Sequence, residues 1–505
     1  MAADNDAVRA FLTRLGDVDT ESLSLEAQLD YEQTKHTLDG MLLRNDVIRP
    51  WAKDPDTYSS GIANDAFVMI SRTFAPPEQR LRSLTARLKL MPNVLAEARK
   101  NLDNPPRIYT EIAIEQIDGN RDFFAKDVPA AFSDVKDTAA LAAFSTANAA
   151  VITALDDYKA WLENDLLPRS NGSFAYGADT YQKVLAANEM ITTPLPDLLA
   201  IANDDLERNR KAFAEAAGKI DSTKSPADVL AEVEMGYPPA SELLAVTQDN
   251  LDGLMQFVRD KHIIDLPPAP PARVVETPPF LRATTSASMD TPGPFEKVAT
   301  EAYFNMTLPN PAWPQDEQDD FMKAWYRQMI SNVSVHEVWP GHYVQFLYAK
   351  NYPSDVRKVF ATASNFEGWA HYCEQMMLDE GLHADDPRYR LAEVQDALLR
   401  DVRFIVGIKM HTEGMTVEQA RDMFVNEAYV PSAVAESEAK RGTSDATYGY
   451  YTMGKLMILK LREDYKKKMG DRYSLKDFHD AFIKLGPLPL PLIRRAMLGE
   501  TGNPF

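Results

Sequence analysis

The sequence predicts a mainly α-helical protein of two helical halves with little β-structure. Stretches with apolar residues at spacings of three and four recur along most of the chain, and alternating runs typical of strands are scarce. A proline-rich segment interrupts this pattern near the middle. The 505 residues also exceed the roughly 250–300 that one hydrophobic core usually holds, so at least two packed units are expected.

The clearest helical pattern of the N-terminal half lies at residues 139–164. Apolar side chains recur there at helical spacing, with alanines between them, which is typical of a helix that buries one face. Similar patterns predict helices over 79–102, 190–217 and 240–261, and Pro-Pro pairs at 76–77 and 105–106 mark breaks.

The strongest break is residues 265–282, which contain three Pro-Pro pairs. Proline excludes regular helix and favours extended backbone, so a stiff connector is expected, with room for a short strand at 273–276. We therefore expect an N-terminal helical half at 1–264 and a C-terminal half at 283–505. In the C-terminal half, after a loop-rich stretch to about 315, helices are expected over 318–350, 355–380, 387–410, 416–427, 447–469 and 475–485.

Charge and cysteine content narrow the possible partners. The net charge is −21, and the one basic run, Lys466–Lys468, is typical of a solvated helix end, so neither nucleic acid nor an anionic membrane is expected as a partner. No apolar run of about 20 residues predicts a membrane span. The single cysteine, Cys373, excludes an intrachain disulfide and is expected to be a small core residue. The start lacks a signal-peptide pattern, so either the protein is cytosolic or a signal has been removed.

Two of the eight histidines stand in the segment His336-Glu337-Val338-Trp339-Pro340-Gly341-His342. Zinc peptidases with the H-E-x-x-H motif place both imidazoles on one face of a helix. Here the second histidine is six positions away, and a regular helix would separate the two by about 120° around its axis. Pro340 and Gly341 predict a helical bulge that absorbs the two extra residues and brings the imidazoles together.

An acidic third ligand is expected on a following helix. Glu367, His371 and Glu374 are spaced i, i+4 and i+7, so they share one helix face. Gly368 and Ala370 lie among them, which favours a packed polar site over a solvated surface.

At these residues the chain resembles the bacterial domain-of-unknown-function 885 family, which is regarded as zinc-metallopeptidase-like. H-E-x-x-P-G-H followed by E-G-W-A-x-Y-x-E is the hallmark of that family. The resemblance extends over nearly the whole chain, and further matching segments lie at 51–58, 87–92, 274–280, 292–295, 451–455, 461–462, 478–480 and 486–490. E-G-W-A-x-Y is also similar to the segment of zinc aminopeptidases that carries their third zinc ligand.

The resemblance implies a zincin-like site supplied by the C-terminal half and a cleft between two helical halves. His336, His342 and Glu367 would hold Zn²⁺, and Glu337 would act as general base. Tyr451 would stabilise the oxyanion, with Tyr448 as the alternative.

The remaining polar residues are expected to support the site, to bind substrate or to pack in the core. Glu374 is expected to hydrogen-bond a ligand histidine, and His371 to help orient a ligand. Arg441 and Arg462 are candidates for binding a substrate carboxylate. His411 and His479 are expected to be packed in the core.

These residues lead to three hypotheses about function. The first is a zinc peptidase acting on short peptides, and the second is a zinc hydrolase of a non-peptide amide bond. The third is a non-catalytic protein that binds metal or peptide, against which the intact Glu337 argues. We expect a periplasmic or secreted protein with its signal removed, with a cytoplasmic one as the alternative. No oligomeric state and no preference for endo- or exopeptidase action is predicted.

Overall fold

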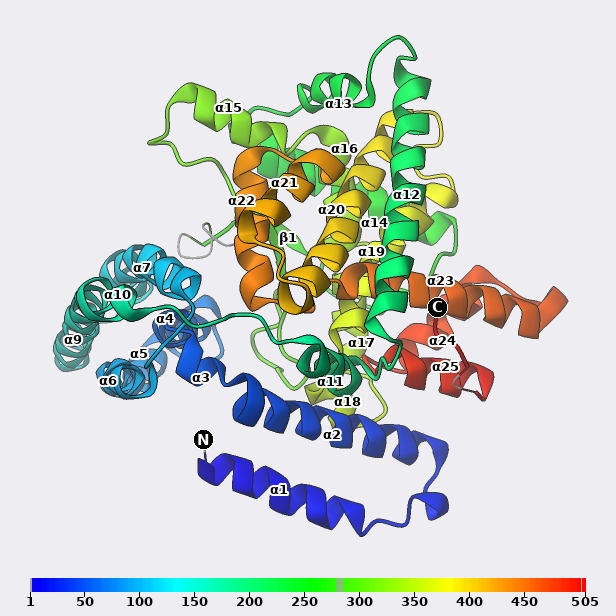
Figure 1. The fold of residues 1–505 in the computed structure, drawn as a ribbon. Coiled ribbons are helices and arrows are strands. Elements are labelled where there is room, and N and C mark those ends of the chain that lie inside the picture. The colour runs from blue at the N-terminus through cyan, green and yellow to red at the C-terminus, as the bar shows by residue number, and fades with distance from the viewer. Residues whose placement is uncertain (1, 279–281, 283–284, 501) are drawn as a thin grey trace.

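The computed structural model describes residues 2–278, 282, 285–500 and 502–505, and it confirms a mainly helical protein. Within these residues the only sheet has three short strands. The helices form two units with separate hydrophobic cores, which we call the arm and the body (Figure 1).

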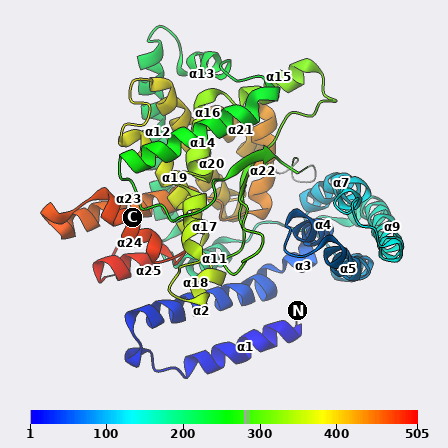
Figure 2. The same ribbon diagram turned by 180° about the vertical axis from the view of Figure 1, so that it is seen from behind.

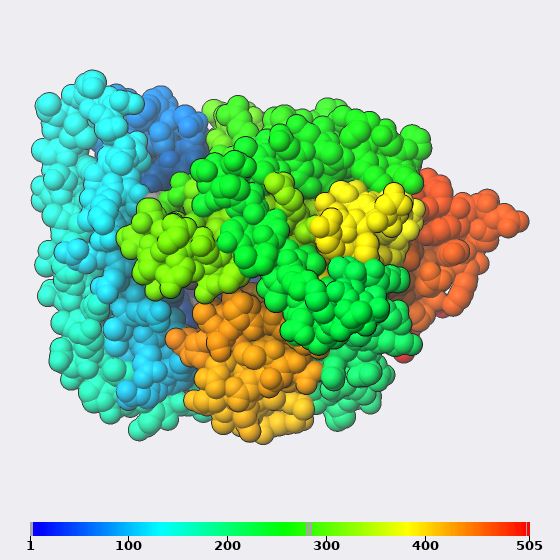
Figure 3. All heavy atoms as spheres, turned by 90° about the horizontal axis from the view of Figure 1, so that it is seen from above, coloured from blue at the N-terminus to red at the C-terminus, as the bar shows by residue number. Residues whose placement is uncertain are grey.

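The arm, residues 50–169, stands at one side of the molecule, as Figure 3 shows from above. Its main helices are α3 (Pro50–Lys53), α4 (Asp56–Ser71), α5 (Pro77–Leu88), α6 (Met91–Asn101), α7 (Arg107–Asp122), α8 (Val128–Ala130), α9 (Thr138–Trp161) and α10 (Leu167–Arg169). The helix expected over 79–102 is divided into α5 and α6, because Pro92 begins a new helix in its first turn.

Within the described residues, Thr138–Arg169 is the one helical stretch that meets the length and hydropathy of a membrane span. Phe144, Val151 and Leu155 of this stretch are buried in the core of the arm. One face therefore packs in the arm, but only 28% of the most apolar window of the stretch is buried there.

The body contains the remaining helices, with α1 and α2 lying side by side along one edge (Figure 1). They are α1 (Ala2–Gly16), α2 (Leu25–Leu43), α11 (Ala178–Glu189), α12 (Leu195–Ile220), α13 (Pro226–Glu234), α14 (Leu243–Asp260), α15 (Gln315–Lys323), α16 (Arg327–Glu337), α17 (His342–Ala349), α18 (Asp355–Val359), α19 (Ala363–Asp379), α20 (Pro387–Thr412), α21 (Val417–Ala428), α22 (Ser432–Ser444), α23 (Tyr450–Met469), α24 (Leu475–Lys484) and α25 (Leu490–Leu498).

The cores divide the chain differently from the boundary expected between 264 and 283. Helices α11 to α14 precede the connector, yet they share one core with the C-terminal helices. The reason is that α12 buries Leu198, Leu206 and Phe213 and packs along α20. The separate unit is therefore the arm, not the whole N-terminal half.

The sheet lies where the connector was expected to be extended. Strand β1 (Arg273–Glu276) confirms the short strand within it and pairs in parallel with β3 (Tyr303–Met306). Strand β2 (Ala287–Asp290) pairs with β3 in antiparallel fashion, which gives the order β1-β3-β2. Seen from behind, α14 lies beside α16 and the sheet (Figure 2).

Two contacts fix α19, the helix that carries Glu367. Gly368 of α19 meets Gly454 of α23 so closely that a Cβ on Gly454 would lie 2.0 Å from the carbonyl oxygen of Ser364. The two backbones therefore touch, and Tyr451, one turn before Gly454, is brought near the N-terminal turns of α19.

At the start of α19, the backbone N–H of Ser364 donates a hydrogen bond to Oε2 of Glu189, the last residue of α11, at 3.2 Å. Glu189 is only 4% exposed, and its burial raises the pKa of this carboxyl from 4.5 to about 7. This buried acid therefore joins the N-terminal part of the body to the helix of the expected site.

We predict that Glu189→Gln stabilises the protein at pH 8 but not at pH 4. The raised pKa means that the folded state prefers the protonated acid, so the stability it contributes is complete below about pH 4.5 and is lost as the pH rises through about 7. Glutamine stays neutral and accepts the same bond, so the variant should be more stable at pH 8 by up to roughly 3 kcal/mol. Denaturant unfolding of wild type and variant at pH 4 and pH 8 measures the difference in their free energies of unfolding. An equal difference at both pH values would show that the carboxyl does not titrate in this way.

Candidate metal centre

The two histidines of the motif lie on either side of a sharp break between two helices. Helix α16 ends at Glu337, one residue after His336, and His342 begins α17. The predicted bulge is therefore wrong, because the helix stops and restarts. Between the helices, the peptide bond from Trp339 to Pro340 is cis.

Gly341 lets the chain fold back onto the end of α16. Its backbone N–H donates to the carbonyl of Val335 at 3.1 Å. A Cβ at this position would lie 1.8 Å from the carbonyl oxygen of His336, so a larger residue does not fit. This close approach places His342 beside His336, and their ring centroids are 4.8 Å apart.

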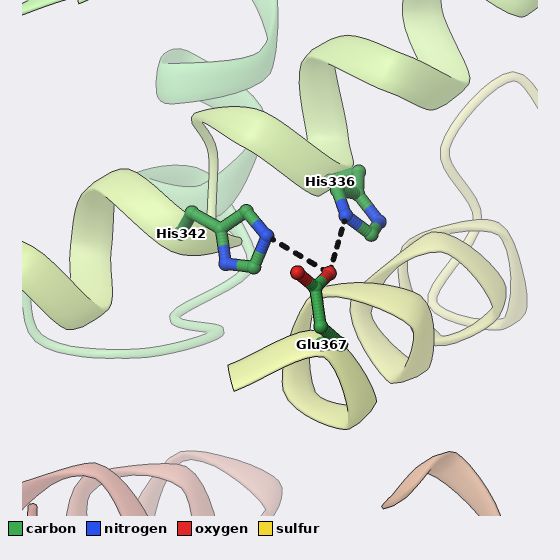
Figure 4. A group of neighbouring side chains, drawn as sticks. All are labelled: His336, His342 and Glu367. Carbon is green, nitrogen blue, oxygen red and sulfur yellow. Dashed lines mark ion pairs between the residues drawn. The ribbon is translucent and has the colours of Figure 1, made fainter. Parts of the chain in front are cut away.

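Glu367 completes a cluster of three converging side chains (Figure 4). Its Oε2 lies 3.4 Å from Nε2 of His336 and 3.3 Å from Nε2 of His342. The three donor atoms all lie within 4.8 Å of one another. The structure thus brings together the three residues predicted as metal ligands.

The donor set and its spacing fit a zinc ion. Zn²⁺ binds nitrogen and oxygen at about 2.0–2.1 Å with tetrahedral geometry, and two such ligand atoms are about 3.3–3.4 Å apart. The two measured His–Glu separations match that value. Oε2 of Glu367 is also buried and has no hydrogen-bond partner among the described residues, as expected of an atom placed for a cation.

Hydrogen bonds at the far side of each imidazole direct its other nitrogen toward the cluster. Nδ1 of His336 donates to Oε1 of Glu374 at 2.6 Å, and Nδ1 of His342 contacts Oε1 of Gln345 at 3.4 Å. A carboxylate only accepts, so the Nδ1 proton of His336 is held by Glu374, and the proton that a cation would displace is the one on Nε2. Such partners fix the tautomer of metal-binding histidines and strengthen them as ligands.

Glu374 is held in turn by other buried groups. Arg400 on α20 contacts Oε1 at 3.2 Å, while Asn332 and Nδ1 of His371 contact Oε2 at 3.2 and 3.3 Å. These contacts keep the carboxylate ionised, and its pKa lies well below 4.5 because Arg400 and His371 outweigh the effect of burial. The bond of Glu374 to His336 is the contact expected from the sequence, whereas His371 contacts Glu374 and none of the three proposed ligands.

Without a cation, the cluster is held by shared protons and charge. Burial alone would lower the pKa of His336, but Glu367 and Glu374 raise it to about 10. Conversely, burial would raise the pKa of Glu367, but His342 and His336 hold it well below 4.5. A bound cation would take over the role of the imidazolium protons, because metal ligation requires neutral histidine.

Glu337 follows His336 directly and is half-buried. It makes no hydrogen bond or ion pair to any residue that the structure describes. A carboxylate without a partner beside a cluster of potential ligands is free to accept a proton from a bound molecule.

The two candidate tyrosines differ in position. The ring of Tyr451 lies 6.2 Å from that of His336, with the guanidinium groups of Arg400 and Arg403 at 5.4 and 5.1 Å. Burial and the Glu367 carboxylate raise the pKa of Tyr451 against the effect of Arg403, so its hydroxyl stays protonated and can donate. Tyr448 is fully buried instead, and its hydroxyl lies against Gly442.

The two arginines proposed to bind substrate lie in different places, because Arg441 interacts with Tyr451 beside the cluster and Arg462 does not. Arg441 pairs with Asp445 at 2.9 Å and donates to the hydroxyl of Tyr450 at 3.2 Å. Arg462 donates to the hydroxyl of Tyr372 at 3.1 Å, whose oxygen also lies 2.8 Å from His479. The structure does not bring Arg462 to the cluster.

The remaining expectations concern core residues, and they are confirmed. Cys373, His411 and His479 are all buried. Burial lowers the pKa of His411 to about 4 and that of His479 to about 3, so both stay neutral.

Three residues at the site were missed from the sequence: Arg400, Gln345 and Asn332. Arg400 had no distinct signal in the sequence, because the stretch 391–410 also contains Glu393, Asp396, Asp401, Arg403 and Lys409. Gln345 and Asn332 are polar residues on helices, and nothing in their spacing marks them out.

The fold and the cluster define a mainly helical protein with a candidate metal centre in its body. The chain belongs to the DUF885 family, described as "bacterial protein of unknown function", whose model matches residues 1–497. No curated protein matches the chain.

Two solved structures resemble it over nearly its whole length. One is described as "a putative lipoprotein of unknown function" from Shewanella oneidensis, with 28% identity, a TM-score of 0.81, and coverage of 98% of this chain and 92% of that one. The other is described as a "putative lipoprotein" from Colwellia psychrerythraea, with 18% identity, a TM-score of 0.80, and coverage of 98% and 89%. At that identity, the second similarity shows the fold alone.

We predict that His342→Ala abolishes stoichiometric zinc binding, because two remaining ligands cannot hold the ion tightly. The matched control is His383→Ala, since His383 is exposed and lies outside the cluster. Elemental analysis after dialysis against a weak chelator should give about one zinc per chain for wild type and control, and a small fraction of that for His342→Ala. Equal zinc in all three proteins would place the metal elsewhere.

Proposed function

We propose that the protein is a zinc-dependent metallopeptidase that hydrolyses short peptides. The observation that carries this proposal is the convergence of two imidazole Nε2 atoms and one carboxylate oxygen, with both His–Glu separations at the value that tetrahedral zinc requires. His336, His342 and Glu367 would hold the ion. When bound, Zn²⁺ supplies the Lewis acidity that makes water a nucleophile near neutral pH.

Glu337 is the group that moves the proton. As a half-buried carboxylate with no partner among the described residues, it accepts the proton of the attacking water. It then delivers that proton to the departing amine. Glu337 directly follows His336 at the end of α16, which keeps its backbone next to that of a proposed zinc ligand.

Tyr451 is the group that stabilises negative charge on the carbonyl oxygen. Its hydroxyl is protonated, lies near Glu367 and stands on the His336 side of the cluster. A donor placed in advance stabilises the oxyanion more than the neutral carbonyl, and so it accelerates the reaction.

We further propose a periplasmic or secreted location. Support comes from the similar structure described as a "putative lipoprotein", a class of protein that is exported. The absence of cysteine pairs is compatible with this location, because one cysteine cannot form an intrachain disulfide.

We predict that Glu337→Gln retains zinc and lowers kcat on a cleaved peptide by about 10³-fold. The amide has nearly the same shape but cannot accept the proton of water. Glu380→Gln, which changes an exposed residue at the end of α19, is the matched control and should retain full activity. Peptide-library digests followed by mass spectrometry, with zinc analysis of each variant, provide both measurements.

The same digests separate the competing functions. Cleavage that persists in Glu337→Gln would remove this residue from the mechanism. Zinc binding with no peptide cleaved by wild type would contradict the peptidase and favour a hydrolase of another amide or a binding protein.

We predict that Tyr451→Phe lowers kcat by about 10²-fold with little change in KM, because the lost bond forms mainly in the transition state. Tyr448→Phe is a close control, since the buried hydroxyl of Tyr448 has no hydrogen-bond partner among the described residues. Steady-state kinetics of both variants measure the difference. Equal effects of the two substitutions would exclude Tyr451 as the specific donor.

A further inference from the structure

Two phenylalanines beside the candidate metal centre are half-buried without belonging to either hydrophobic core. They are Phe346 on α17 and Phe366 on α19. Among the described residues, neither packs against the core of the body or that of the arm. Many half-buried apolar side chains of this protein pack against one of those cores. Core packing therefore does not account for the presence of these two phenylalanines.

The pair packs against itself and against a proposed zinc ligand. The ring centroids of Phe346 and Phe366 are 5.4 Å apart, and they lie 6.2 and 6.4 Å from the ring of His342. Their place follows from the sequence: Phe346 is one helical turn after His342, and Phe366 directly precedes Glu367. The three rings form one continuous wall at the cluster.

The other histidine of the cluster has neighbours of a different chemistry. His336 faces the ring of Tyr451, which the guanidinium groups of Arg400 and Arg403 flank. The two histidines therefore separate an apolar side from a polar, cationic one. A substrate that spans the cluster meets aromatic rings at one end and hydrogen-bond donors at the other.

We propose that Phe346 and Phe366 form the specificity pocket of this site and select peptides with a large apolar residue next to the scissile bond. The apolar side chain packs on the two rings, while the carbonyl faces Tyr451. This inference rests on the proposed function, because it assumes that the substrate binds at the cluster. It assigns the two phenylalanines to substrate recognition, not to chemistry.

The first test measures binding, independently of hydrolysis. Acetohydroxamic and phenylacetohydroxamic acids carry the same zinc-chelating group and differ by one phenyl ring. Calorimetry on the zinc-loaded protein should show the phenyl compound binding about tenfold more tightly, which is a usual gain from filling an apolar pocket. In the double variant Phe346→Ala/Phe366→Ala that ratio should fall to about twofold or less, with the affinity for acetohydroxamic acid unchanged.

Two controls separate recognition from structure. Phe346→Leu/Phe366→Leu keeps apolar side chains and should retain most of the preference. Phe11→Ala removes a phenylalanine that is 42% exposed on α1 and should change nothing. Equal affinities of wild type for the two hydroxamates, or an equal weakening of both in the alanine variant, would overturn the inference.

The second test is cleavage of paired peptides that differ only in having Phe or Ala at the scissile bond. Wild type should prefer Phe by at least about tenfold in kcat/KM, and the alanine variant should lose that preference through KM. A phenyl preference in binding without any cleavage would overturn the peptidase and leave the pocket intact. Cleavage without a preference would overturn the pocket and leave the peptidase intact. If neither hydroxamate binds, both proposals fail.

Discussion

The site depends on one close backbone contact, in which Gly341 folds the chain back onto the end of α16. Because the space beside the carbonyl of His336 does not admit a Cβ, the return is possible only at glycine. The contact lets a helix that has ended at Glu337 be followed at once by another that starts with His342. Without it, six positions of helix would turn the second histidine away from the first.

Charge balance is the second requirement of this arrangement. The carboxylates of half-buried Glu367 and fully buried Glu374 contact the two different ring nitrogens of His336, and burying a carboxylate such as Glu374 alone would cost several kcal/mol. The positive charge of Arg400 balances the negative charge of Glu374. This carboxylate can therefore orient His336 without attracting a metal cation. Glu367 has no such cation among the described residues other than the imidazoles. Differences in the partners of two glutamates on one helix thus separate the proposed metal ligand from the proposed supporting group.

The three residues of the cluster could be predicted from the sequence because they belong to local patterns. His336 and His342 share one segment, and Glu367, His371 and Glu374 share one helix face, so each group is short in sequence. The way the helices meet could not be predicted, because the break at Pro340 and the contact of Gly368 with Gly454 are tertiary features. The short strand at 273–276 was predicted, whereas its partners β2 and β3 were not.

Longer-range packing also limited the prediction of domains and of small helices. The connector at 265–282 does mark a change from helix to strand. However, α12, which precedes it, buries its apolar face on α20, which follows it. The hydrophobic cores therefore do not divide at the connector. Helices α22 and α25 were missed because α22 is rich in small and charged residues and α25 follows two prolines closely. Their buried faces are set by neighbours distant in sequence.

The most direct test of this account is a crystal structure of the protein grown with Zn²⁺ and measured on both sides of the zinc absorption edge. The account predicts an anomalous peak about 2.0–2.2 Å from Nε2 of His336, Nε2 of His342 and a carboxylate oxygen of Glu367. Density at this position without an anomalous signal, or a zinc peak only at other residues, would contradict it.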